Sequence, residues 1–76
     1  MEVESGIYEH YKGKRYKVIG LAKHSETEEN LVVYKPLYKV KERHKGLMWV
    51  RPKTMFFEKV LIDGKKVPRF KYLSRK

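Results

Sequence analysis

The sequence predicts one small all-β domain, and three observations lead to this prediction. The chain has 76 residues, a length that suits a single domain. Short runs rich in β-branched and aromatic residues alternate with Gly, Pro and charged turns. The turns recur about every eight to twelve residues, a spacing typical of small barrels and sandwiches. No internal repeat or low-complexity tract interrupts this pattern.

The first two expected strands form a hairpin. Residues 6–11 alternate and are rich in aromatic side chains, so we expect a strand there. Gly13 then allows a tight turn, because glycine tolerates positive φ. Residues 16–24 form the second expected strand. We expect one of its faces to carry Tyr16, Val18, Gly20, Ala22 and His24, and the other to carry Ile19 and Leu21.

Residues 25–30 are polar and contain three Glu. Ser25 and Glu28 have the spacing of a helix capping box. The residues that follow, 31–34, prefer a strand, so we interpret 25–30 as a hairpin loop with an acidic tip. The third expected strand runs over 31–38, and Pro36 marks an edge or a bulge.

The second half of the chain continues with short elements separated by turns. In order we expect a basic loop at 39–46, a strand at 48–51, a helical turn at 52–56 that Pro52 starts, a strand at 58–62 and a last strand at 67–72 interrupted by Pro68. Asp63-Gly64 is a strong hairpin signal.

Five or six short antiparallel strands with one helical turn predict a small SH3-like roll or partly open barrel. Such a sheet hides most of its edges by curling on itself. We expect a short extension at 1–5, the domain at 6–72 and a frayed basic tail at 73–76. A chain this short buries only about 60% of its unfolded surface, so the ten aromatic residues are expected to serve the core first.

The formal net charge is +10 and is unevenly distributed. Residues 1–34 hold five Lys or Arg and six Glu, a net charge of −1. Residues 35–76 hold fourteen Lys or Arg and three Asp or Glu, a net charge of +11. This asymmetry favours a polyanionic partner, either nucleic acid or an acidic protein. The simpler alternative is that the lysines keep a small domain soluble.

The chain has no cysteine, so disulfides and thiolate chemistry are excluded. Its first residues are acidic and lack the apolar stretch of a signal peptide. The longest apolar run, 31–34, is far too short to span a membrane. We therefore expect a cytoplasmic protein that does not bind membranes, and we favour a monomer.

Aromatic and basic side chains near strand ends are the strongest candidates for a binding surface, because such sets can stack bases and contact phosphates. They are Lys12, Tyr34, Tyr38, Trp49, Arg51, Lys53 and Arg69. The alternative is that Trp49 and Tyr34 close the core.

A second candidate site is the polar loop formed by His24, Ser25, Glu26, Thr27 and Glu29. We favour a structural role for it, because Ser and Thr at a hairpin corner usually bond their own backbone. In that interpretation Glu26 or Glu29 pairs with Arg51 or Arg69. A small-ligand or catalytic cleft around His24, Glu26 and Arg51 is the third hypothesis, and no catalytic residue is assigned.

Neither a metal nor a cofactor is expected. His10, His24 and His44 are scattered, without the close spacing of a metal site. The five glycines are dispersed and none opens a helix, so a phosphate-binding glycine loop is excluded.

Several motifs together resemble a known family. They are Gly6-x-Tyr8-x-His10-Tyr11-Lys12-Gly13, Tyr16-x-Val18-x-Gly20-x-Ala22-x-His24-Ser25-Glu26-Thr27, Val32-Val33-Tyr34, Leu37-Tyr38, Trp49-Val50-Arg51-Pro52, Met55-Phe56, Glu58-x-Val60 and Pro68-Arg69-Phe70. Over about residues 6–70 the chain resembles the bacterial domain-of-unknown-function family numbered 1653. The resemblance implies an SH3-like β roll and no established activity, substrate or cofactor. The long basic loop 39–46 departs from the family pattern.

We conclude from the sequence that this is a non-enzymatic binding module. Nucleic acid, either RNA or a single strand, is the first hypothesis for its partner. A protein- or peptide-interaction module that uses an aromatic groove is the alternative.

Overall fold

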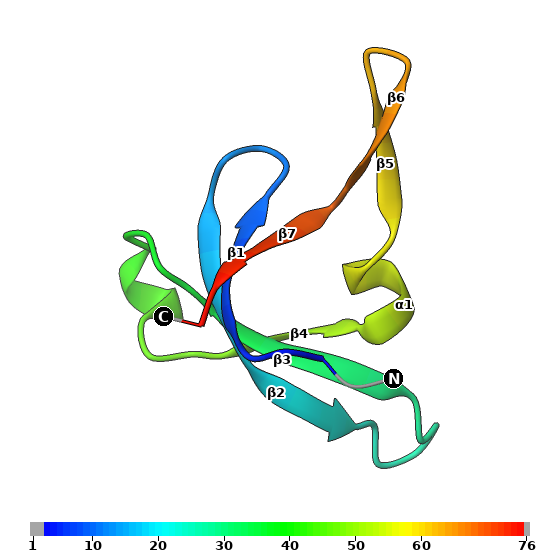
Figure 1. Ribbon diagram of the computed structural model, residues 1–76. Helices are drawn as coiled ribbons and strands as arrows, with labels where there is room; N and C mark the ends of the chain where they lie inside the picture. The colour runs from blue at the N-terminus through cyan, green and yellow to red at the C-terminus, as the bar shows by residue number, and fades with distance from the viewer. Residues whose placement is uncertain (1–2, 76) are drawn as a thin grey trace.

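The computed structural model describes residues 3–75, and the predicted all-β fold class is confirmed (Figure 1). The described residues form seven strands, one short α-helix and one 3-10 turn. These are β1 Gly6–His10, β2 Arg15–Lys23, β3 Asn30–Pro36, η1 Glu42–His44, β4 Trp49–Pro52, α1 Lys53–Phe56, β5 Lys59–Ile62, β6 Lys65–Pro68 and β7 Phe70–Ser74.

The strand count exceeds the predicted five or six because the last expected strand is divided. Residues 67–72 fall into β6 and β7, which belong to different sheets. Pro68 ends β6, and Arg69 forms the corner between the two strands. The predicted helical turn is present as α1, although Pro52 is its N-cap rather than its first residue.

The main sheet has five antiparallel strands in the order β4-β3-β2-β1-β7. The sheet curls far enough for a side chain of one edge strand, β4, to reach the other edge strand, β7: the Arg51 guanidinium carbon on β4 lies 5.7 Å from the centre of the Phe70 ring on β7. Side-chain contact therefore links the two edges. We call this line of contact the β4–β7 seam.

A β-bulge in β2 corrects one prediction. The pairing of β2 with β3 shifts register between Val18 and Gly20, and beyond it Leu21 lies opposite the buried Val32. The expected alternation of faces therefore holds up to Val18 and is reversed after the bulge. The bulge also marks where β2 leaves β1, since β1 pairs only as far as Val18.

The core lies on the inner face of the curled sheet. It consists of Tyr8, Val18, Val32, Tyr34, Phe56 and Phe70, each at most 4% exposed. Phe56 is presented by α1, which follows β4 directly and packs its ring against the sheet. Four of the six core residues are aromatic, so rings supply most of the buried apolar area of this small domain.

Both ends of the domain are attached to the sheet. Val3 packs against the core, and the Tyr8 hydroxyl donates a hydrogen bond to the Glu4 carbonyl. Gly6 has φ 143°, and a Cβ there would collide with the Ser74 carbonyl oxygen. The sequence predicts fraying from residue 73, but β7 continues to Ser74, which pairs with Ile7. Lys76 lies outside the described residues, as do Met1 and Glu2.

The two-stranded β5–β6 hairpin projects from the body of the domain (Figure 1). Asp63 and Gly64 form its turn with φ values of 49° and 78°, as their sequence predicts. Leu61 at its tip is 69% exposed. No helix within residues 3–75 is long and apolar enough to cross a membrane.

Candidate functional site

Phe70 is the centre of an aromatic cluster at the β4–β7 seam. Its ring stacks on Phe56 with the two centres 4.1 Å apart. His10, Tyr16 and Tyr34 approach it at centre-to-centre distances of 5.0, 5.6 and 5.7 Å. The cluster forms because β-pairing places His10 opposite Phe70, while the curl of the sheet brings β2 and β3 to the same ring.

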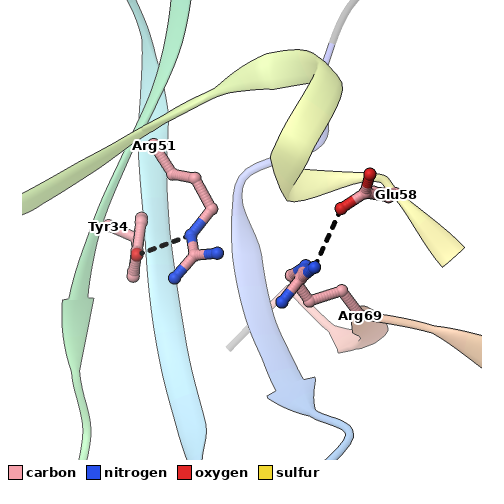
Figure 2. Close-up of polar contacts among 4 residues, drawn as sticks. All are labelled: Tyr34, Arg51, Glu58 and Arg69. Atoms are coloured by element: carbon pink, nitrogen blue, oxygen red, sulfur yellow. Dashed lines mark hydrogen bonds and ion pairs between the residues drawn. The ribbon is translucent and has the colours of Figure 1, made fainter. Parts of the chain in front are cut away.

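Arg51 crosses the seam from β4. Its Nε donates a hydrogen bond of 3.4 Å to the Tyr34 hydroxyl, and its guanidinium carbon lies 5.7 Å from the Phe70 ring centre (Figure 2). The side chain is partly buried. None of the ion pairs found within residues 3–75 involves Arg51. Its positive charge is therefore held against aromatic rings without a neutralising carboxylate.

Arg69 lies at the corner between β6 and β7. Its Nη2 donates to Glu58 Oε1 at 2.8 Å, and its side chain is 21% exposed. Its Nε is buried and has no hydrogen-bond partner within residues 3–75. Figure 2 shows the guanidinium ends of Arg51 and Arg69 turned toward each other. The prediction that Glu26 or Glu29 pairs with Arg69 is wrong, because Glu58 takes that place.

His10 packs against the same Phe70 ring as Arg51. Its Nδ1 accepts the Lys12 backbone N–H at 3.2 Å, which leaves the proton of the neutral imidazole on Nε2. Burial lowers the pKa of His10, and the positive charges of Arg51, Arg69 and Lys12 lower it further. The imidazole is therefore a neutral donor in a positively charged neighbourhood. We call His10, Arg51, Arg69 and Phe70 the seam cluster.

Tyr16 extends the aromatic surface toward the turns. Its hydroxyl lies 3.0 Å from the Tyr38 hydroxyl, and its ring centre lies 5.4 Å from that of Tyr34. Burial, together with this hydrogen bond, raises the pKa of Tyr16 well above its usual range. Lys14 Nζ lies 4.3 Å from the centre of the Tyr38 ring.

Of the aromatic residues predicted to bind a ligand, Tyr34 is buried in the core and Trp49 is exposed. Tyr34 is only 3% exposed and belongs to the core, where its hydroxyl meets Arg51. Trp49 pairs with Tyr34 across the strands, which places both side chains on the inner face, but Trp49 is 38% exposed. Its ring meets His44 edge to face with centres 5.6 Å apart. The inner face is therefore buried at Tyr34 and open to solvent at its edge, where Trp49 lies.

Neither predicted lysine is a member of the seam cluster, although the Lys12 backbone N–H donates to His10 Nδ1. Lys12 is exposed in the turn after β1, and its Nζ lies 5.8 Å from the Tyr11 ring centre. Lys53 is partly buried and is the first residue of α1.

The polar loop 24–29 forms a turn whose polar atoms bond its own backbone. His24 Nδ1 accepts the N–H groups of Glu26 and Thr27 at 3.1 and 3.3 Å. Thr27 Oγ1 accepts the Glu29 N–H at 3.2 Å, and the His24 carbonyl accepts the Glu28 N–H. Glu26, Thr27 and Glu29 are exposed, as is Ser25. Arg51 makes its contacts elsewhere, so His24, Glu26 and Arg51 do not form a cleft.

A separate groove of about 610 Å³ lies between β2–β3 and the loop before β4. Its apolar wall includes Ile19, Leu37 and Met48, which are 45%, 47% and 62% exposed. Lys35, Lys39 and Lys45 add positive charge along it.

Sequence reasoning missed three members of the site. From the sequence, His10, Tyr16 and Phe70 are family-motif residues, His10 is also a rejected metal ligand, and none of the three is a predicted binding residue. The alternation of 6–11 places His10 on the same face as Tyr8, and this signal was available. The meeting of His10 with Arg51 was not predictable, because it depends on how far the sheet curls.

Within residues 3–75 no three His, Asp or Glu side chains gather as a metal-binding group. The geometry defines a small all-β roll with aromatic rings on its inner face and unneutralised positive charge at its seam.

The chain belongs to the family described as "Protein of unknown function (DUF1653)", whose model matches residues 6–72. It is similar to a solved structure of a DUF1653 protein from Bordetella bronchiseptica at 37% sequence identity. The similarity covers 97% of this chain and 91% of that chain, with a TM-score of 0.85. No curated protein matches the chain.

Proposed function

We propose that this protein is a binding module for nucleic acid, with single-stranded nucleic acid or RNA as its partner. The observation that carries the proposal is the pairing of cations with aromatic rings. Lys12 with Tyr11, Lys14 with Tyr38 and Arg51 with Phe70 form three such pairs. A lysine or arginine within about 6 Å of a ring centre has the geometry of a cation–π pair, and residues 3–75 contain these three.

The chemistry of single-stranded nucleic acid matches this surface. Its bases stack on aromatic side chains, and its phosphates are attracted to lysine and arginine. Trp49 offers a partly exposed ring at the rim of the inner face, and Arg51 offers positive charge without a carboxylate partner within residues 3–75. The net charge of +10 attracts polyanions to the protein as a whole.

The test uses the fluorescence of Trp49, the single tryptophan of the chain, during titration with unstructured twelve-nucleotide RNA and DNA. We expect the fluorescence to change on binding. We also expect the affinity to fall steeply with salt, with a logarithmic slope of about −0.7 for each phosphate contacted. Unchanged fluorescence and anisotropy at low salt, or an affinity independent of salt, would contradict the proposal.

The matched variants are Trp49→Ala and Leu61→Ala. Both remove a partly exposed apolar side chain, but Leu61 is on the projecting hairpin. Loss of a stacked ring costs about 1–3 kcal/mol per base, so Trp49→Ala should weaken binding roughly 5- to 150-fold by anisotropy. Leu61→Ala should bind as the natural sequence does.

The groove beside β2–β3 supports a second candidate, a module that binds peptides. Its exposed apolar side chains and its lysines fit a segment that carries both apolar and acidic residues. A pull-down whose partner survives nuclease treatment, and which is lost on Met48→Glu, would favour this candidate over nucleic acid.

A further inference from the structure

Three nitrogen-bearing side chains from separate parts of the chain meet at the seam. His10 ends β1, Arg51 lies on β4, and Arg69 forms the corner before β7. His10 and Arg51 both contact the Phe70 ring, and Arg69 directly precedes Phe70 in the chain. Figure 2 shows the two guanidinium ends turned toward each other. Folding therefore concentrates hydrogen-bond donors at one place.

Each of the three retains donor capacity. Arg51 uses Nε for the Tyr34 hydroxyl, and its remaining N–H groups have no hydrogen-bond acceptor or ion-pair partner within residues 3–75. Arg69 gives Nη2 to Glu58, and its buried Nε lacks a partner in the same range. His10 has Nδ1 occupied by the Lys12 N–H, so Nε2 is the free donor of the neutral ring.

The charge of the site is positive. Glu58 offsets Arg69, but Arg51 and Lys12 remain without a carboxylate partner within residues 3–75. Burial and these cations lower the pKa of His10, which agrees with an unneutralised positive field at the ring. A bound anion would accept hydrogen bonds from the Arg51 N–H groups that have no acceptor within residues 3–75, and it would offset the positive charge.

We propose that His10, Arg51 and Arg69 together bind a single phosphate group. Guanidinium forks match the oxygens of phosphate, and the neutral imidazole adds one further N–H. Where the phosphate belongs to a nucleic acid, this inference rests on the function proposed above. Where it is free phosphate, the site stands independently of that function.

The first experiment titrates the whole chain with sodium sulfate and with inorganic phosphate at pH 7, against sodium chloride at equal ionic strength. NMR follows the His10 ring and the Arg51 Nε–H. We expect saturable shifts of both signals with sulfate and phosphate only. Sulfate keeps its double charge over pH 5–8, so it also shows whether a bound dianion raises the pKa of His10. The titratable or charged residues near this ring are Glu9, Tyr11, Lys12, Tyr16, Arg51, Arg69 and Lys71.

Two variants and a control test the role of Arg51. Arg51→Gln removes the charge and the fork, and should weaken anion binding about 10-fold or more. Arg51→Lys keeps the charge without the fork and should weaken anion binding to a smaller extent. If Arg51→Gln does not fold, Arg51→Lys replaces it in the test. Lys66→Gln removes one charge from the exposed β5–β6 hairpin and should bind as before. Shifts that match chloride, or equal affinity in Arg51→Gln and Lys66→Gln, overturn the site.

The second experiment compares the same twelve-nucleotide strand with a 5′ phosphate, a 3′ phosphate and no terminal phosphate. Tighter binding of one phosphorylated strand, lost in Arg51→Gln, supports the site and assigns the strand end as its ligand. Equal binding of all three, reduced in Arg51→Gln, supports the site with an internal phosphate. Saturable sulfate binding without any strand binding supports the site and contradicts the proposed function. Strand binding that Arg51→Gln leaves unchanged, with no sulfate effect, overturns the site and leaves the function standing.

Discussion

The turns after β1 and β2 make the same local hydrogen bond in opposite surroundings. His10 Nδ1 accepts the N–H of Lys12 at 3.2 Å, and His24 Nδ1 accepts the N–H of Glu26 at 3.1 Å. Each turn therefore uses an imidazole to bond backbone two residues further on. Around His10, however, the sheet curl adds Phe70 and two arginines, whereas the turn at His24 bonds mainly its own backbone and carries exposed carboxylates.

Local sequence therefore determines the turn conformation, whereas contacts with residues distant in the chain determine the chemical surroundings of each imidazole. His24 is followed by Ser, Glu and Thr, residue types that can act in catalysis, so the sequence suggests a site there. His10 is followed by Tyr and Lys, and its sequence context suggests no site beyond the rejected metal site. The surroundings of His10 differ from those of His24 because β-pairing places His10 opposite Phe70 and because Arg51 of β4 reaches the same ring. The predictions that follow test that distinction.

Removal of the ring that joins the seam should have the largest effect. Phe70→Ala deletes a side chain that is 4% exposed and contacts four other rings. The loss should be about 3–5 kcal/mol of unfolding free energy, because the cavity adds to the lost transfer energy. Urea denaturation measures it, with Leu61→Ala as a control that changes stability by at most about 0.5 kcal/mol. A loss for Phe70→Ala as small as that of the control would mean that the seam does not hold the fold together.

The pH dependence of stability should come partly from His10. Its pKa is lowered in the folded state, first by burial and then by Arg51, Arg69 and Lys12. The unfolded chain takes up the proton at about pH 6.5, before the folded chain does. Stability is therefore fully present above that pH, is lost as the pH falls through 6.5, and levels off below the folded pKa.

Melting temperatures at pH 7.5 and 5.5 check this in a chloride buffer. The decrease between the two should be smaller in His10→Gln than in the natural sequence. Sodium sulfate should also reduce the decrease in the natural sequence, since a bound anion stabilises the imidazolium. An unchanged decrease in His10→Gln would show that His10 does not experience the positive field.

The turn at His24 should respond least. His24→Ala removes an acceptor for two exposed N–H groups and should cost about 0.5–1.5 kcal/mol. His24→Asn should recover most of this, because Asn bonds backbone two residues on in the same way. Neither variant should alter nucleic-acid affinity. A tenfold loss of affinity in His24→Ala would place the acidic tip in the binding site and remove the contrast between the two turns.

The sequence predicts the fold of this molecule better than its site. Alternation over 6–11, the Asp63-Gly64 turn and Pro52 before a helical turn are local signals, and the strands and α1 follow from them. The bulge at Val18–Gly20 is not predicted by the alternation, so the faces expected beyond it are reversed in the structure. Tyr34 is in the core rather than on a platform because α1 brings Phe56 to its ring, with centres 5.5 Å apart. Glu58 replaces the expected loop carboxylates because the corner at Arg69 brings the two residues together.

The most direct test is an NMR titration of the isotope-labelled chain with a single-stranded twelve-nucleotide RNA at low salt. Backbone and side-chain signals are followed for the seam and for the turn at 24–30. We expect saturable shifts at His10, Trp49, Arg51 and Phe70 that added salt reverses, and no shifts at residues 24–30. Shifts confined to the turn at 24–30, or no shifts at any position, would contradict it.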